Sequence, residues 1–245
     1  MGFCGGTVAG STTVAGVADL PLIGRGRAAD VFDLGGGRVL RRYRTPHPGV
    51  TEREAIAMRH LRAHGAPVPE VFSAEGDEIV MQRLEGRSML ETLKAKPWTA
   101  RSIGRQLAEL QRRIHAVPAG DLALPRLGEG DSLLHFDLHP DNVMLTPDGP
   151  VVIDWSNVVV GDPVADVMFS WMIMVTSVPD DVPRLLLPAL RLIRHQLTDG
   201  FIGETVIDNH ARHWIADVCE RRLKDPNCRP AEQVAVRTFA AQHAR

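Results

Sequence analysis

The stretch from residue 133 to residue 154, LLHFDLHPDNVMLTPDGPVVID, constrains the fold more than any other segment of the chain. Residues 143–145 and 151–153 are short apolar runs. Between them, residues 146–149 have the Pro and Gly of a four-residue β-turn. The pattern therefore predicts a tight antiparallel hairpin.

Polar side chains are predicted to meet at the open end of this hairpin. If the first and last residues of the turn pair with each other, Asn142 lies opposite Ile153, one residue from Asp154. Adjacent strands are about 4.8 Å apart, so the amide and the carboxylate should be neighbours. Asp137 arrives on the loop that precedes the hairpin. Oxygen ligands grouped in this way suit Mg²⁺, which favours carboxylates together with phosphates.

Two kinds of chemistry fit these residues. His135, Asp137 and His139 alternate, so on a strand they would share one face and could form a metal-dependent hydrolase site. However, Pro140 ends any strand there, and a hydrolase has no use for the amide placed beside the carboxylate.

Phosphoryl transfer is the stronger interpretation. That reaction needs a carboxylate to orient the attacking hydroxyl, an Asn on the metal five residues later, and a second metal-binding Asp beyond a hairpin. Asp137, Asn142 and Asp154 have this order and spacing.

The rest of the chain changes character near residue 86. Residues 1–18 are interpreted as a loose leader. Residues 19–85 contain short apolar runs broken by glycines, which predict a small sheet with one helix at about 52–64. Residues 86–245 are mainly helical, with Ile103, Leu107, Leu110 and Ile114 on one helical face. Further helices are predicted near 164–176, 181–198, 202–224 and 231–243. The expected fold class is α+β, with two lobes.

Three motifs carry a family resemblance: His135-Phe-Asp137-Leu-His139-Pro-Asp-Asn142, Ile153-Asp154-Trp155 and Gly161-Asp162-Pro163-x-x-Asp166. Together they resemble the aminoglycoside phosphotransferase family, small-molecule kinases that share the protein-kinase fold. The resemblance runs from about Gly24 to Trp171. It implies that Asp137 is the catalytic base, that Asn142 and Asp154 bind Mg²⁺, and that Asp166 is a structural acid.

The chain departs from that family's pattern at two places. Phe136 stands where the family often has Gly, which affects the local geometry of the loop. Trp155-Ser156 stands where protein kinases have Phe-Gly, and Trp is a tolerable aromatic replacement.

The N-terminal lobe offers an independent match to a kinase. Gly24-Arg-Gly26-Arg-Ala-Ala29-Asp-Val31 fits the glycine-rich loop of kinases, with Ala29 in place of the third Gly. Small residues there let backbone amides approach phosphates. A Gly-x-Gly turn can also be an ordinary hairpin between strands. The motif supports a nucleotide-binding loop because it lies in the N-terminal lobe, ahead of the catalytic segment. By the same resemblance, the backbone near Gln82 and Leu84, where the lobes join, should meet the adenine of ATP.

The lysine that grips the ATP phosphates in kinases is missing. The chain has 28 basic residues, of which three are lysines, and none precedes Lys94. Arg41 occupies the corresponding position, with Arg42 as the alternative if the register slips by one. Arginine is planar and bulkier than lysine, so this replacement is not conservative.

Glu54 resembles the helix glutamate that pairs with this cation. Thr51-x-x-Glu54 is also a capping box, which by itself would explain the glutamate.

We expect an ATP- and Mg²⁺-dependent phosphotransferase that acts on a hydroxyl of a small molecule. A kinase-like protein that binds nucleotide without catalysis is the alternative, because the lysine is missing. The net charge of −2 and the single tyrosine do not favour a nucleic-acid partner. The longest apolar stretch, 167–175, is too short to span a bilayer, and the three cysteines have no metal-ligand spacing. A cytoplasmic location is therefore expected, and the acceptor and the oligomeric state stay open.

Overall fold

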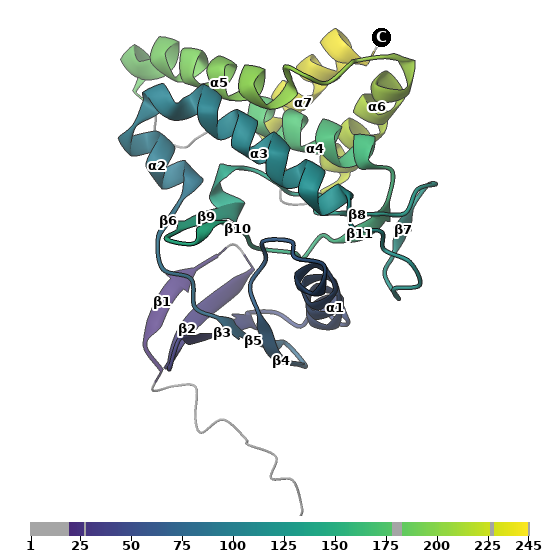
Figure 1. The fold of residues 1–245 in the computed structure, drawn as a ribbon. Helices are drawn as coiled ribbons and strands as arrows, with labels where there is room; N and C mark the ends of the chain where they lie inside the picture. The colour runs from purple at the N-terminus through teal and green to yellow at the C-terminus, as the bar shows by residue number, and fades with distance from the viewer. Residues whose placement is uncertain (1–19, 27, 178–182, 226–227, 245) are drawn as a thin grey trace, which may run out of the picture.

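A computed structural model describes residues 20–26, 28–177, 183–225 and 228–244. The first third of the chain forms a five-stranded antiparallel sheet with one helix against it (Figure 1). The strand order is β1-β2-β3-β5-β4, which places β3 in the centre of the sheet. The elements are β1 (Leu22–Arg25), β2 (Ala29–Gly35), β3 (Arg38–Tyr43), α1 (Val50–Ala63), β4 (Val71–Glu75) and β5 (Glu78–Gln82).

The predicted glycine turn joins β2 to β3. Gly36 and Gly37 both have positive φ angles, 57° and 73°, which residues with a side chain rarely adopt. The turn sets a register in which Val31 lies opposite Arg41.

Helix α1 confirms the helix predicted at 52–64, but the predicted capping box is wrong. The helix begins at Val50, after Gly49 at the cap position with φ 74°. Thr51 is therefore inside the first turn, where it is buried and its hydroxyl has no hydrogen-bond partner. Glu54 is turned away from the helix start and bonds the sheet instead.

The remainder of the chain is mainly helical, with short strands between the helices (Figure 1). This division into a sheet-rich and a helical part confirms the predicted fold class. The helices are α2 (Met89–Ala95), α3 (Ala100–His115), α4 (Pro163–Thr176), α5 (Leu187–Ile202), α6 (Asn209–Lys224) and α7 (Pro230–His243). The strands are β6 (Arg87–Ser88), β7 (Arg126–Leu127), β8 (Ser132–Leu134), β9 (Val143–Thr146), β10 (Gly149–Val152) and β11 (Val159–Gly161).

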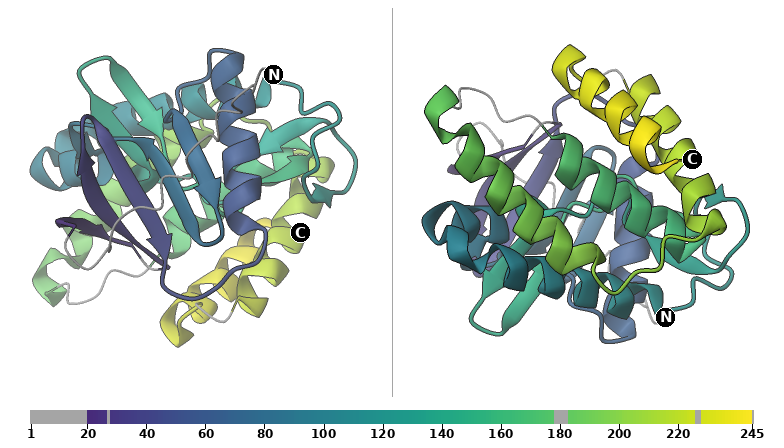
Figure 2. Two further views of the ribbon diagram at one scale, coloured as in Figure 1. Left: turned by 90° about the horizontal axis from the view of Figure 1, so that it is seen from below. Right: turned by 90° about the horizontal axis from the view of Figure 1, so that it is seen from above.

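The predicted apolar face of helix α3 is buried. Helix α5 runs beside it (Figure 2, right). The two backbones approach closely because Gly104 and Gly200 stand at the contact. A Cβ atom on Gly104 would lie 2.1 Å from the carbonyl oxygen of Leu197, so any side chain there would push the helices apart.

Two helix boundaries differ from the prediction. The helix predicted at 181–198 begins at Leu187, after a 3₁₀ turn, and the first residues of that prediction lie outside the described residues. The helix predicted at 202–224 begins at Asn209, because the Asp208 side chain accepts a hydrogen bond from the Ala211 amide and caps the helix there. The predicted leader, 1–18, also lies outside the described residues.

The hairpin of β9 and β10 has the predicted register. Thr146 pairs with Gly149, and Val143 pairs with Val152. β6 pairs with β9 on its other edge, which extends the hairpin into a three-stranded sheet (Figure 1). Among the residues that the structure describes, no helix is both long and apolar enough to cross a membrane.

Candidate active site

The loop between β8 and β9 carries Asp137 and Asn142, and the two residues bond each other. The Asn142 side-chain Nδ2 donates to the Asp137 carbonyl oxygen at 2.8 Å and lies 3.5 Å from its carboxylate. His139 Nε2 is 3.8 Å from the same carboxylate. Because Nδ2 is used in this way, the Oδ1 atom of Asn142 is the one left to bind a metal ion.

A buried carboxylate fixes the start of this loop. Asp166, on α4, is fully buried and accepts hydrogen bonds from the backbone amides of His135 and Phe136, at 3.1 and 2.8 Å. His115, at the end of α3, bonds the same carboxylate at 2.8 Å. Burial opposes the charge of Asp166, but the hydrogen bond and electrostatic attraction of His115, with smaller effects of His135 and Gln111, outweigh it and hold its pKa below the usual 3.8. Asp166 is therefore an anchor for the loop, as the family resemblance implies.

Phe136 adopts a left-handed backbone conformation, with φ 57°. This explains why glycine is common at the equivalent place in the family, since the conformation costs an ordinary residue about 1–2 kcal/mol. Here the Phe136 ring stacks on Phe169 with their centroids 4.5 Å apart. The stacking and the amide bond to Asp166 offset the cost.

Asp154 lies directly beyond the hairpin, as predicted. The Ile153 amide donates to the Asn142 carbonyl oxygen at 3.0 Å, which ties the two predicted metal ligands together through the backbone. Asp154 also has a positive φ, 62°. Its side chain is 40% exposed, and its Oδ1 accepts from Ser156 at 2.9 Å and from Arg41 at 2.7 Å. Desolvation opposes its charge, but Arg41 and Ser156 hold the pKa of Asp154 below its usual range.

Asn142 and Asp154 fit a hard cation. The two hydrogen bonds to Asp154 both use Oδ1, so a metal bound through Oδ2 would not break them. Two protein oxygens and the phosphates of a nucleotide form the kind of donor set that Mg²⁺ prefers.

Arg41 joins the sheet to the hairpin. One end nitrogen of its guanidinium, Nη1, bonds Glu54 of α1, and the other, Nη2, bonds Asp154. The neighbouring Arg42 bonds Glu78 instead, so the structure brings Arg41 rather than Arg42 to Asp154. The contact between Arg41 and Glu54 agrees with the pairing interpretation of the glutamate.

The predicted glycine-rich loop lies at one edge of the sheet, on β1 and β2. Gly24 pairs with Val31 across β1 and β2, and the Gly26 amide donates to the Ala29 carbonyl oxygen at 2.8 Å, which closes the turn. Ala29 is buried.

Gln82 ends β5, opposite Arg38, and its side-chain oxygen accepts from the Glu70 amide at 3.3 Å. Leu84 follows in the segment that leads to β6 and is half-buried.

Of the two alternating histidines, His139 lies beside Asp137, but His135 is engaged elsewhere. His135 is buried, its Nε2 lies 2.9 Å from the Ile153 carbonyl oxygen, and its ring meets Trp155 edge to face. Within the described ranges, no group of three or more His, Cys, Asp or Glu side chains is placed to hold a metal ion. This arrangement does not support the hydrolase interpretation.

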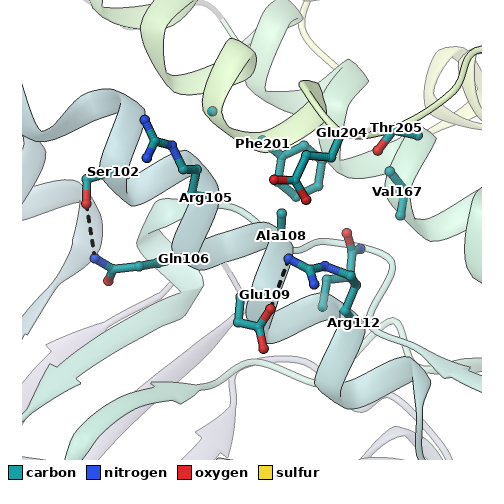
Figure 3. A pocket seen from close by; sticks show the side chains of 12 residues that line it. Ser102, Arg105, Gln106, Ala108, Glu109, Arg112, Val167, Phe201, Glu204 and Thr205 are labelled. Carbon is teal, nitrogen blue, oxygen red and sulfur yellow. Dashed lines mark hydrogen bonds and ion pairs between the residues drawn. The ribbon is translucent and has the colours of Figure 1, made fainter.

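A cavity of about 450 Å³ lies in the helical part, away from these residues. Its lining comes from α3, α4, the end of α5 and the loop that follows it, with Arg112 and Glu204 among the polar side chains (Figure 3). None of the predicted site residues lines it.

Sequence reasoning missed two contacts in the site. The Tyr43 hydroxyl bonds Glu54, and His115 bonds Asp166. His115 ends the amphipathic helix α3, and no motif in the sequence marks it. No motif marks Tyr43, although it lies two residues after Arg41 on the same strand.

The fold and the contacts of the loop define a kinase-like phosphotransferase. Residues 19–132 and 122–194 match the model of the phosphotransferase enzyme family APH, and the chain belongs to this family.

Solved structures with the same fold cover nearly the whole chain. One is a thermostable mutant of the aminoglycoside phosphotransferase APH(4)-Ia in a ternary complex with AMP-PNP and hygromycin B; it is 17% identical, with a TM-score of 0.64 and 95% of each chain covered. Another is a choline/ethanolamine kinase family protein from Mesorhizobium loti, 16% identical, with a TM-score of 0.54 and 94% and 88% of the two chains covered. At such identities the likeness shows the fold alone.

One curated relative also matches. The EKC/KEOPS complex subunit BUD32 of Encephalitozoon cuniculi is 33% identical over 91 residues, which are 36% of this chain and 46% of that protein. The chain therefore spans about half the length of this relative.

We predict that Asp166→Asn lowers the free energy of unfolding by about 3 kcal/mol at pH 7, because breaking a buried hydrogen-bonded charge is strongly destabilising. The pKa of Asp166 is lowered in the folded state, so its contribution is present above the unfolded value of 3.8 and is lost as the pH falls below it. Urea unfolding from pH 7 to pH 3 should show the difference shrink.

The matched control is Asp131→Asn, which removes an exposed pair with Arg126. It should cost less than about 1 kcal/mol. A loss for Asp166→Asn that is equal at every pH would contradict the proposed role of the charge.

Proposed function

We propose that this chain is a small-molecule kinase, which transfers the γ-phosphoryl group of ATP, bound with Mg²⁺, to a hydroxyl group of its acceptor. The observation that supports this most directly is the 2.7 Å bond between Arg41 and Asp154. It joins the cation assigned to the ATP phosphates to the carboxylate assigned to the metal. The AMP-PNP in the structure of the related APH(4)-Ia supports the choice of ATP.

In this mechanism Asp137 is the catalytic base. Its side chain is 31% exposed, on a loop whose start is fixed by Asp166. It orients the acceptor hydroxyl for in-line attack and accepts the proton of that hydroxyl. Asn142 and Asp154 would hold Mg²⁺, which supplies charge neutralisation at the phosphates. Catalysis then depends mainly on positioning and on fixed charge.

We assign the nucleotide to the N-terminal sheet, from the glycine-rich loop of β1 and β2 to the end of β5. The amides of Gly24 and Gly26 would approach the phosphates, where Ala29 and Val31 leave room. The backbone from Gln82 to Leu84 would meet the adenine. Arg41 would contact the α- and β-phosphates while Glu54 holds its other side.

The acceptor is expected to meet the helices of residues 164–245, and we propose a small alcohol of low positive charge. The acidic side chains of α6 are already engaged: Asp208 caps the helix, Asp217 bonds Arg221 at 2.7 Å, and Glu220 bonds Lys224 at 2.5 Å. A polycationic acceptor would have to displace these contacts.

We predict that Asp137→Ala lowers the turnover number by at least about 100-fold, because general-base assistance is typically worth that much or more. The affinity for nucleotide should stay within about twofold, because Asp137 acts on the acceptor. ADP release is measured across aminoglycosides, amino alcohols, sugars and nucleosides. Asp148→Ala, on the exposed hairpin turn, is the control. Wild-type turnover in Asp137→Ala would refute the assignment of the base.

We predict that Asp154→Ala abolishes the dependence of nucleotide affinity on Mg²⁺. Calorimetry is run with ATP in the presence of Mg²⁺ and again with EDTA. The wild type should bind at least about tenfold more tightly with the metal, a difference of about 1.4 kcal/mol, and the variant should show no difference. Comparing the two conditions within one variant separates the metal from the ion pair that Asp154 makes with Arg41.

A nucleotide-binding protein without transferase activity is the second candidate, and Arg41 is the observation that favours it. Both arms of its guanidinium are held by carboxylates, whereas a lysine would present one compact ammonium.

Arg41→Lys separates the two candidates. In an active enzyme we expect the affinity for ATP to change by about tenfold, since one ammonium cannot make both contacts with the same geometry. An inactive protein should stay inactive in this variant. Arg42→Lys is the matched control, because Arg42 bonds Glu78 and should have little effect. The measurement is the turnover number and the KM for ATP of each variant, from steady-state kinetics at varied ATP concentration.

A further inference from the structure

Tyr43 stands beside the Arg41–Glu54 pair. It lies two residues after Arg41 on β3, so both side chains project from the same face of the sheet. The Tyr43 ring lies under the guanidinium, with its centroid 4.9 Å from Arg41 Cζ, and the residue is only 5% exposed.

The two contacts of Glu54 use different oxygens. Arg41 donates to Oε2, and the Tyr43 hydroxyl donates to Oε1. Glu54 itself is 1% exposed. Both carboxylate oxygens are therefore bonded, and the plane of the carboxylate is fixed relative to the sheet.

This matters because the cation is an arginine. A lysine ammonium is a point charge that tolerates rotation, but a guanidinium is planar and its nitrogens have fixed directions. Arg41 must present Nη1 to Glu54 and Nη2 to Asp154 at the same time. Any tilt of the Glu54 carboxylate would move the arm that reaches Asp154.

We propose that Tyr43 is a positioning residue of the nucleotide site: its hydroxyl and ring hold Glu54 and Arg41 in the one orientation in which the arginine takes the place of the phosphate-binding lysine. This inference rests on the proposed function. It adds a residue that neither the glycine-rich loop nor the catalytic motif contains.

The Tyr43 hydroxyl also affects the pKa of Glu54. Burial raises the pKa of Glu54 to about 7, and the charge of Asp154 adds to this, while Arg41 and the Tyr43 hydroxyl oppose it. These three are the groups that face Glu54 from β3 and from the loop after β10. Removing the hydroxyl takes away a bond to the ionised form, so the pKa of Glu54 should rise further. Glu54 would then lose its charge, and its grip on Arg41, at a higher pH.

The test compares Tyr43→Phe with Thr51→Val in the full chain. Both remove one buried hydroxyl near Glu54, but that of Thr51 has no hydrogen-bond partner. Tyr43→Phe should weaken the binding of MgATP by about fivefold to tenfold at pH 7, raise the KM for ATP, and leave the KM for the acceptor unchanged. Thr51→Val should match the wild type in all three.

The pH profile is the readout that a purely structural role would not change. The acidic limb of kcat/KM for ATP should move to higher pH in Tyr43→Phe and stay in place in Thr51→Val. Wild-type nucleotide affinity together with a wild-type pH profile in Tyr43→Phe would overturn the proposal.

Failure of the proposed function has a different signature. If Asp137→Ala keeps full turnover while Tyr43→Phe weakens nucleotide binding, the assignment of the base fails and the role of Tyr43 stands. If the wild type binds no nucleotide, both are overturned. Thermal unfolding of each variant shows whether it is folded. If Tyr43→Phe does not fold, Tyr43→Met replaces it, since the proposal requires the same shift from any side chain that fills the site without a hydroxyl.

Discussion

The geometry of the site depends on the buried carboxylate of Asp166. Removing such a charge from water costs several kcal/mol unless its oxygens are bonded, and here two backbone amides and His115 bond them. The amides belong to His135 and Phe136, so the bonds that compensate the charge also fix the residues directly before Asp137. The left-handed backbone of Phe136 costs about 1–2 kcal/mol, which is less than the cost of leaving the Asp166 carboxylate buried without these bonds. Stability and the placement of Asp137, the proposed base, therefore have one common cause.

The second constraint is the bridge that Arg41 makes between two carboxylates. One guanidinium carries a single positive charge, and it bonds both Glu54 and Asp154. With the two carboxylates ionised, the cluster keeps one negative charge, beside an Asp154 side chain that is 40% exposed. A divalent cation bound at the free oxygen of Asp154 would be attracted by this charge. The replacement of lysine by arginine is thus consistent with a metal at Asp154, because the arginine adds a contact to the carboxylate without neutralising the whole cluster.

The parts of the structure that local chemistry dictates could be predicted from the sequence. The register of the β9–β10 hairpin follows from four turn residues and two apolar runs, all within a dozen positions. The role of Glu54 could not be predicted in this way, because its spacing from Thr51 fits either a capping box or a pairing with Arg41. Gly49 decides between the two, since it caps a helix that begins at Val50 and so places Thr51 inside the first turn. The start of α6 was missed because the pattern that predicted a helix from 202 could not locate its cap, which Asp208 supplies. Tyr43 was missed because its contact with Glu54 joins a strand to a helix and leaves no periodic trace.

Membership of the family sets the reaction class but not the acceptor. The fold is shared with a protein whose structure holds hygromycin B and with a choline/ethanolamine kinase family protein, so the fold alone does not fix the acceptor. In this chain, Asp162 caps α4 and also bonds His210 and Trp214 of α6. The Asp162 carboxylate thus holds α4 against α6, just as the Asp166 carboxylate holds the loop before Asp137. These two carboxylates are therefore engaged by the fold and are not the groups that would recognise a charged acceptor, which agrees with the proposed acceptor of low positive charge.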